Sequence, residues 1–123
     1  MTHRATLVAL ALVAPLLVGA QSSVDLAGTR PATPGITRTT LKDDAKVSVA
    51  RVQFAPGATE VAHTHPYDIM IIPVTSGPVS MQVGDRKTTS LKSGEVQFVP
   101  RDVSHYVGNT GNAEFVLIAV AVK

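Results

Sequence analysis

The chain has 123 residues, 45% of them apolar, and its 11 Lys and Arg residues nearly balance 9 Asp and Glu residues. This length is enough for one hydrophobic core and too short for two domains. Because the chain contains no cysteine, a disulfide framework, thiolate metal ligands and a cysteine nucleophile are all excluded. The charged residues form no basic stripe, which argues against nucleic acid as a partner.

The first 20 residues have the pattern of an export signal. His3 and Arg4 give a positively charged start, residues 7–18 are almost entirely apolar, and Ala20 follows small residues suited to cleavage. The apolar run is shorter than the roughly 18 residues that a membrane-spanning helix needs. We therefore predict cleavage after Ala20, a periplasmic or secreted mature protein, and no membrane contact once residues 1–20 are removed.

The chain after the export signal has two parts that differ in composition and apolar periodicity, residues 21–35 and residues 36–123. The first stretch is rich in small, polar and proline residues without apolar periodicity, and we predict a flexible lead-in there. The second alternates short runs of β-branched and aromatic residues with turn residues, which is typical of one all-β domain, a sandwich or barrel. Between two runs, Gly84-Asp85 has the composition of a two-residue hairpin turn. The expected strands are residues 36–41, 46–55, 68–74, 79–83, 86–91, 96–99, 104–107 and 114–122.

The last expected strand, residues 114–122, is apolar on both faces. Alternate residues of a strand point to opposite sides, so each face needs its own cover. One face can line the core, and the other can pack on a second sheet or on a partner subunit. A partner is the simpler solution for so small a domain, and we predict a homodimer.

Two histidines, His63 and His65, stand two residues apart at the start of a β segment, and on a strand residues with this spacing point to the same side. The surrounding sequence GATEVAHTHP at 57–66, closed by Gly77, resembles the first motif of the cupin superfamily. The sequence GEVQFVPRDVSHYVGN at 94–109 resembles the second. Within the superfamily, the chain is similar to the compact bacterial cupins associated with β-alanine degradation.

This resemblance implies an antiparallel jelly-roll barrel of six to eight strands, with His63, His65 and His105 pointing inward to bind one divalent transition metal ion. Neutral imidazole is the commonest side-chain ligand for such ions, which agrees with the implied site. Iron is the first candidate, and copper, zinc, nickel and manganese remain open. The alternative is a cupin barrel in which the histidines form a hydrogen-bonded cluster without a metal.

The motifs depart from the family at two positions. Met70 occupies the place of the usual glutamate ligand. Three interpretations stay open: Met70 is an inward-facing core residue beside a three-histidine site, Met70 is a weak fourth ligand, or Asp68 replaces the glutamate. Asp102 stands where the family has glycine, and aspartate tolerates the positive φ of a turn. Tyr67 and Tyr106, next to the ligands, are candidates for lining the pocket or for hydrogen bonding to the ligands.

Three functional hypotheses follow for such a site. The first is an oxidoreductase, a dioxygenase or a related enzyme, that acts on a small organic molecule, with the metal supplying the reactivity. The second is a protein that binds a metal ion or a small ligand without turnover. The third, an isomerase or epimerase, needs a general base, and the sequence singles out none of Asp68, Glu60 and Tyr106. We rank the oxidoreductase first.

The export signal gives a testable prediction. Protein recovered from the periplasm of the producing cell should begin near Gln21, because cleavage follows the small residues that end the apolar run. Mass spectrometry of the intact protein measures this mass, with the cytoplasmic fraction of the same cells as the control. Intact Met1 in the periplasmic material would contradict the signal.

Overall fold

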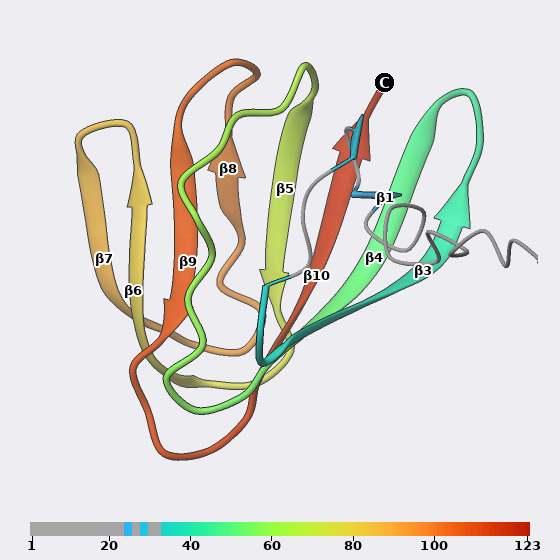
Figure 1. Cartoon of the computed structure of the whole chain (residues 1–123). Coiled ribbons are helices and arrows are strands. Elements are labelled where there is room, and N and C mark those ends of the chain that lie inside the picture. Colours follow the sequence, from blue (N-terminus) through green and yellow to red (C-terminus); the bar gives the residue numbers. More distant parts are fainter. Residues whose placement is uncertain (1–23, 26–27, 30–32) are drawn as a thin grey trace, which may run out of the picture.

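A computed structural model describes residues 24–25, 28–29 and 33–123 of the chain (Figure 1). The predicted export signal, residues 1–20, lies outside the described residues, as does part of the predicted lead-in. Within the lead-in, the two-residue strands β1 (Val24–Asp25) and β2 (Gly28–Thr29) pair antiparallel. The described residues contain no helix, and therefore none that could cross a membrane.

Eight longer strands build the domain, and they match the expected strands within two residues at every end. The alternation of β-branched runs with turn residues was therefore enough to place them. The strands are β3 (Ile36–Asp43), β4 (Val47–Phe54), β5 (Asp68–Pro73), β6 (Gly77–Val83), β7 (Arg86–Leu91), β8 (Gln97–Val99), β9 (His105–Asn109) and β10 (Phe115–Val122).

These strands form two antiparallel sheets that diverge from one end of the molecule (Figure 1). The large sheet has the order β3-β4-β10-β5-β8, and the small sheet has the order β7-β6-β9. Strands far apart in the sequence are neighbours, as where β10 lies between β4 and β5. This arrangement confirms the expected all-β jelly-roll barrel.

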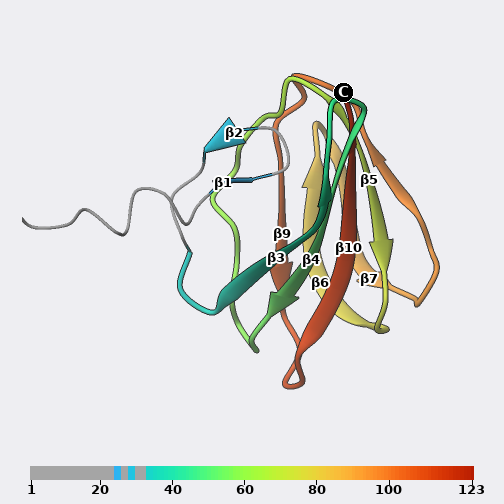
Figure 2. The ribbon, with the colours of Figure 1, turned by 90° about the vertical axis from the view of Figure 1, so that its right-hand side faces the viewer.

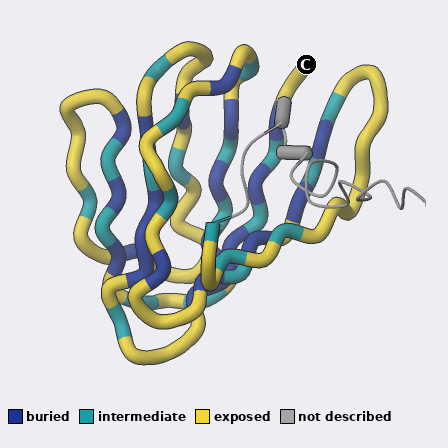
Figure 3. Tube along the Cα trace, viewed as in Figure 1, coloured by how far each residue is buried: buried dark blue, intermediate teal, exposed yellow. Residues whose placement is uncertain are grey.

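The core lies between the two sheets, and buried residues alternate with less buried ones along β4, β5, β6 and β10 (Figure 3). Phe54 and Phe115 face each other across β4 and β10, with ring centroids 6.3 Å apart. The core cluster consists of Ala50, Val52, Phe54, Ile69, Ile71, Val79, Met81, Val83, Leu91, Val99, Val107, Phe115, Leu117, Ala119 and Ala121.

Strand β10 is apolar on both faces, as its sequence predicts. Leu117 and Ala119 are buried in the core, whereas Ile118 and Val120 on the opposite face are half-buried and Val122 is exposed. The large sheet therefore has an apolar outer face that is partly accessible. That a second copy of the chain covers this face in a homodimer stays a prediction.

Two turns have the conformation that their residues predict. Gly84, with a φ of 56°, lies in the two-residue turn between the paired residues Val83 and Arg86. Asp102, with a φ of 61°, is the one non-glycine residue with positive φ in the described part of the chain. Aspartate thus takes the conformation of the glycine that the second cupin motif usually has at this position.

Substitutions at Asp102 test whether this positive φ has a conformational cost. Asp102→Gly should leave the free energy of unfolding about unchanged or raise it slightly, because glycine adopts positive φ freely. Asp102→Val should lower it by about 1–2 kcal/mol, because a β-branched side chain is disfavoured there. Urea denaturation measures both, with Thr110→Val at an exposed loop position as the control. Equal stabilities of the parent and Asp102→Val would contradict the prediction.

Candidate metal centre

The segment before β5, residues 59–65, runs alongside β9 and is called the strap below (Figure 2). Isolated bridges join Thr59 to Gly108 and His63 to His105. At the second bridge, the N–H of each histidine donates to the carbonyl of the other, at 3.0 and 2.9 Å. The strap therefore extends the small sheet beyond β9 and holds two of the three predicted ligands opposite each other.

The bridge between Thr59 and Gly108 depends on the absence of a side chain. A Cβ atom at Gly108 would meet the Oγ1 atom of Thr59 at 2.6 Å, far closer than van der Waals contact allows. Glycine thus permits the strap to approach β9 closely at this end.

The third histidine, His65, lies at the end of the strap. Its carbonyl accepts a hydrogen bond from the N–H of Asp102 at 2.8 Å, so the positive-φ turn holds this part of the strap. The ring of His65 lies 4.8 Å from that of His63 and 4.8 Å from that of His105, and the latter two rings are 4.3 Å apart, measured between centroids. His65 and His105 are buried, and His63 is half-buried.

Hydrogen bonds fix which nitrogen of two rings can bind a metal. The Nδ1 atom of His63 lies 2.7 Å from the carbonyl oxygen of Val61, and that of His105 lies 2.9 Å from the carbonyl oxygen of Val103. A carbonyl can only accept, so Nδ1 must carry the proton. In the neutral ring this leaves the lone pair on Nε2, which is the usual arrangement of a metal-binding histidine.

The three side chains fit a transition metal ion. One ligand atom from each of His63, His65 and His105 lies within 4.8 Å of the other two. Nitrogens bonded to one ion at about 2.1 Å can be no more than about 4.2 Å apart. Small ring rotations would therefore close the set around an ion. No carboxylate of the described residues joins this group.

The sequence profile of the cupin domain family matches residues 50–121, which contain all three histidines and both motifs. The chain belongs to the cupin superfamily. The beta-alanine degradation protein BauB of Pseudomonas aeruginosa is 33% identical to this cupin over 92 residues, which are 73% of this chain and 96% of that protein.

Other relatives of this cupin are similar over part of their length or in fold. Germin-like protein 1-1 of Oryza sativa subsp. japonica is 34% identical over 77 residues, 59% of this chain but only 36% of that protein. The chain thus spans about a third of this germin-like relative. A crystal structure of a cupin domain from Bordetella pertussis Tohama I has a TM-score of 0.65 and 29% identity, covering 76% of this chain and 99% of that one.

Asp68, one of the two candidates for a fourth ligand, is engaged elsewhere in this cupin. Its side chain is exposed at the start of β5, and its Oδ1 atom accepts a hydrogen bond from the N–H of Arg101 at 3.0 Å. The same oxygen lies 3.8 Å from the Nε atom of Arg101. The carboxylate therefore caps the loop before the Asp102 turn, and the structure does not bring it to the three histidines.

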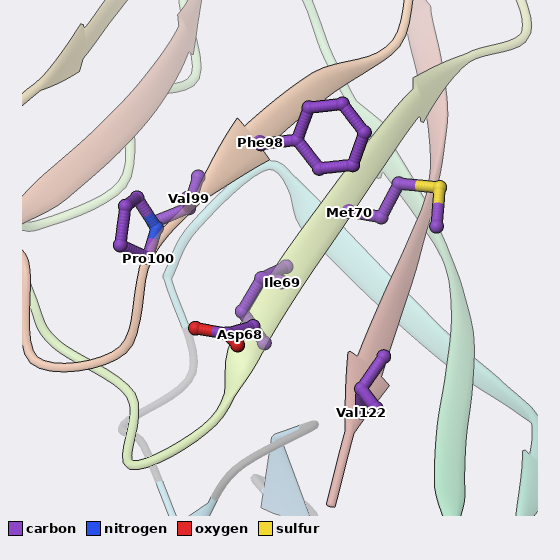
Figure 4. A pocket seen from close by; sticks show the side chains of 7 residues that line it. All are labelled: Asp68, Ile69, Met70, Phe98, Val99, Pro100 and Val122. Carbon is purple, nitrogen blue, oxygen red and sulfur yellow. The ribbon is translucent and has the colours of Figure 1, made fainter.

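Met70, the other candidate, lies on the wrong face of β5. Ile69 and Ile71 enter the core, so the residue between them points outward, where it lies beside Phe98 of β8 and lines an apolar pocket of about 320 Å³ (Figure 4). The expectation of an inward-facing Met70, as core residue or as ligand, is therefore wrong. Residues 64–67, which lie between His63 and β5, are not in a strand, so the alternation of β5 does not continue from the histidines and sets the face of Met70 by itself.

The two tyrosines that the sequence placed near the ligands also differ from each other. Tyr67 is half-buried and packs against the core cluster, close in sequence to His65. Tyr106 lies between His105 and Val107, which both face inward, so its side chain faces the other side of the small sheet, where Gln82 is its partner in register. Only Tyr67 thus remains a candidate for contact with the site.

Two charged residues outside the ligand group, Arg38 and Glu60, contact each other at the strap. Glu60 stands at the start of the strap, and its carboxylate pairs with the guanidinium of Arg38 on β3. From the sequence alone, Glu60 is a candidate only for a general base. Nothing in the sequence pointed to Arg38, because a pair 22 residues apart is created only by the packing of two sheets.

The position of Met70 predicts that its thioether does not bind the metal. Met70→Leu, a nearly volume-conserving change, should leave the affinity for Cu(I) unchanged and alter the free energy of unfolding by less than about 1.5 kcal/mol. Anaerobic Cu(I) competition titrations of the parent and the variant measure the affinity, with His105→Ala as the control that loses a ligand. A clear loss of Cu(I) affinity in Met70→Leu would contradict this prediction and indicate that the thioether binds the metal.

Proposed function

We propose that this cupin is an exported metalloprotein in which His63, His65 and His105 hold one divalent first-row transition metal ion, with iron as the first candidate. The observation that carries the proposal is the convergence of three imidazoles, two of which have Nδ1 bonded to a carbonyl group and therefore carry the lone pair on Nε2. Three imidazoles leave coordination positions open on an ion of this class.

We further propose oxidoreductase chemistry of the dioxygenase kind on a small organic molecule. A metal ion bound by three neutral ligands would keep its full positive charge and supply both Lewis acidity and redox reactivity. The protein's own part is to orient the rings on the strap and on β9, and to bury His65 and His105, which limits access of water. The half-buried His63 marks the side on which a small molecule can approach.

Two observations support this ranking. The histidine group contains no carboxylate from the described residues, and an isomerase or epimerase would need a general base beside its substrate. Metal-based oxidation demands less of the side chains, because the ion carries the reactivity. The name of the Pseudomonas aeruginosa relative refers to degradation of beta-alanine, a small organic molecule, which agrees with a substrate of that size class.

The lack of a carboxylate in this group, among the described residues, also supports a second candidate, a periplasmic or secreted protein that binds a metal ion or small ligand without turnover. Such a protein needs only the ligand set, and two of its three rings are well buried. The identity of the bound metal separates the two candidates, because redox-active iron serves oxidation whereas copper or zinc held without oxygen consumption serves binding.

The metal content of the protein tests the proposed function. Protein purified without added metal should contain about one iron ion per chain by elemental analysis, since three imidazoles suit Fe(II). His63→Ala, His65→Ala and His105→Ala should each lower the retained metal at least about tenfold while circular dichroism still reports a folded barrel.

Thr64→Ala, an exposed residue between two ligands, is the matched control and should keep its metal. Stoichiometric copper or zinc without oxygen consumption would favour the binding protein. Metal retention at the parental level in all three histidine variants would rule out the site.

A further inference from the structure

The strap and β9 do not pair in a regular register. Between the bridge at Thr59 and the bridge at His63 the strap advances four residues, while β9 advances three from His105 to Gly108. One extra residue on the strap is a β-bulge, and a bulge leaves part of the ladder without its regular partner. The bulge lies next to the two histidines that face each other across this ladder.

Glu60 forms hydrogen bonds with β9 at the bulge, through both its main chain and its side chain. Its main-chain N–H donates to the carbonyl of Val107 at 3.0 Å, and its side-chain Oε2 atom accepts from the N–H of Val107 at 3.0 Å. Val107 is buried in the core, so its N–H would be costly to leave without an acceptor. The carboxylate thus replaces the main-chain carbonyl that the bulge moves away.

Arg38, on the other sheet, binds this carboxylate. Its Nη2 atom donates to the Oε1 atom of Glu60 at 2.7 Å, and the two side chains are only 16% and 9% exposed. Arg38 belongs to β3, the edge strand of the large sheet, whereas the strap is the outer edge of the small sheet. The ion pair therefore links the free edges of both sheets beside the histidines, in a partly buried place where such bonds are strong.

We propose that Glu60, held by Arg38, is a positioning residue for the metal centre, because it locks the bulged strap on β9 and so keeps His63 opposite His105. The isolated bridges of the described strap to β9 lie at Thr59 and His63, on either side of Glu60. The side chain of Glu60 does not join the ligand group. The inference rests on the proposed metal-binding function, and it assigns the ion pair a role in metal affinity rather than in the stability of the whole barrel.

Four variants separate the contributions of the pair. Glu60→Ala removes the carboxylate that accepts from Val107 and pairs with Arg38. Glu60→Gln keeps an acceptor for Val107 but removes the charge that Arg38 binds, and Arg38→Met leaves the carboxylate without this cation. Arg38→Lys retains a cation and should restore part of the effect. Asp43→Asn is the matched control, because Asp43 lies on the same strand β3 and its ion pair with Lys123 is equally short, at 2.6 Å.

The affinity for Co(II), used as a spectroscopic probe metal, is measured for all five variants. Glu60→Ala should weaken Co(II) binding by about 10–100-fold, the usual effect of removing a residue that orients ligands. Glu60→Gln and Arg38→Met should give smaller losses in the same direction, Arg38→Lys should lie closer to the parent, and Asp43→Asn should equal the parent. Parental Co(II) affinity in both Glu60 variants would overturn the proposal.

Hydrogen exchange of the metal-free protein gives a readout that does not depend on metal binding. In Glu60→Gln and Glu60→Ala, the amides of His63 and His105 should exchange about tenfold faster or more, while amides of the β4–β10 ladder keep their protection. Equal loss of protection throughout the barrel would overturn the proposal in favour of a general stabilising role. The outcome is different if the parent protein binds no metal while the amides of His63 and His105 still exchange faster in the Glu60 variants. In that case Glu60 holds the strap on β9 as proposed, and the proposed metal-binding function fails.

Discussion

Two main-chain hydrogen bonds between His63 and His105 join the strap to β9, and the candidate site depends on this contact. The bonds place two imidazoles opposite each other on the inner side of the small sheet, with the ring of His65 completing the group. Neither histidine could be held this way by its own strand alone, because the strap lies before β5 and β9 follows much later in the chain. The jelly-roll topology brings the two segments together, and the core behind them keeps both in place.

This contact is maintained across an irregular stretch of the ladder. A bulge in the strap removes a main-chain acceptor from the buried Val107, and the Glu60 carboxylate takes its place. A carboxylate in such a place needs a cation, and Arg38 provides one from the opposite sheet edge. These polar contacts join the strap to both sheets, whereas the apolar core fills the space between the sheets.

The ligand set has consequences for chemistry. With Met70 on the outer face and Asp68 bonded to the Arg101 loop, the group consists of three neutral imidazoles. In such a set the protein would supply no negative charge to a bound dication. Met70, which stands in the place of the family's glutamate, adds an apolar side chain to the outer face of the large sheet (Figure 4).

The sequence by itself determined the eight strands, the three histidines and the turn at Asp102, because period-two alternation, turn residues and two long motifs are local signals. Only the tertiary structure decided the face on which Met70 lies. Side chains alternate between the two faces only from the residue where β5 becomes regular, and the sequence does not mark that residue. The tertiary structure also decided the role of Glu60, which depends on a one-residue slip between the strap and β9 and on Arg38 from another sheet. Long-range register and contacts between sheet edges are set by packing, which no local pattern records.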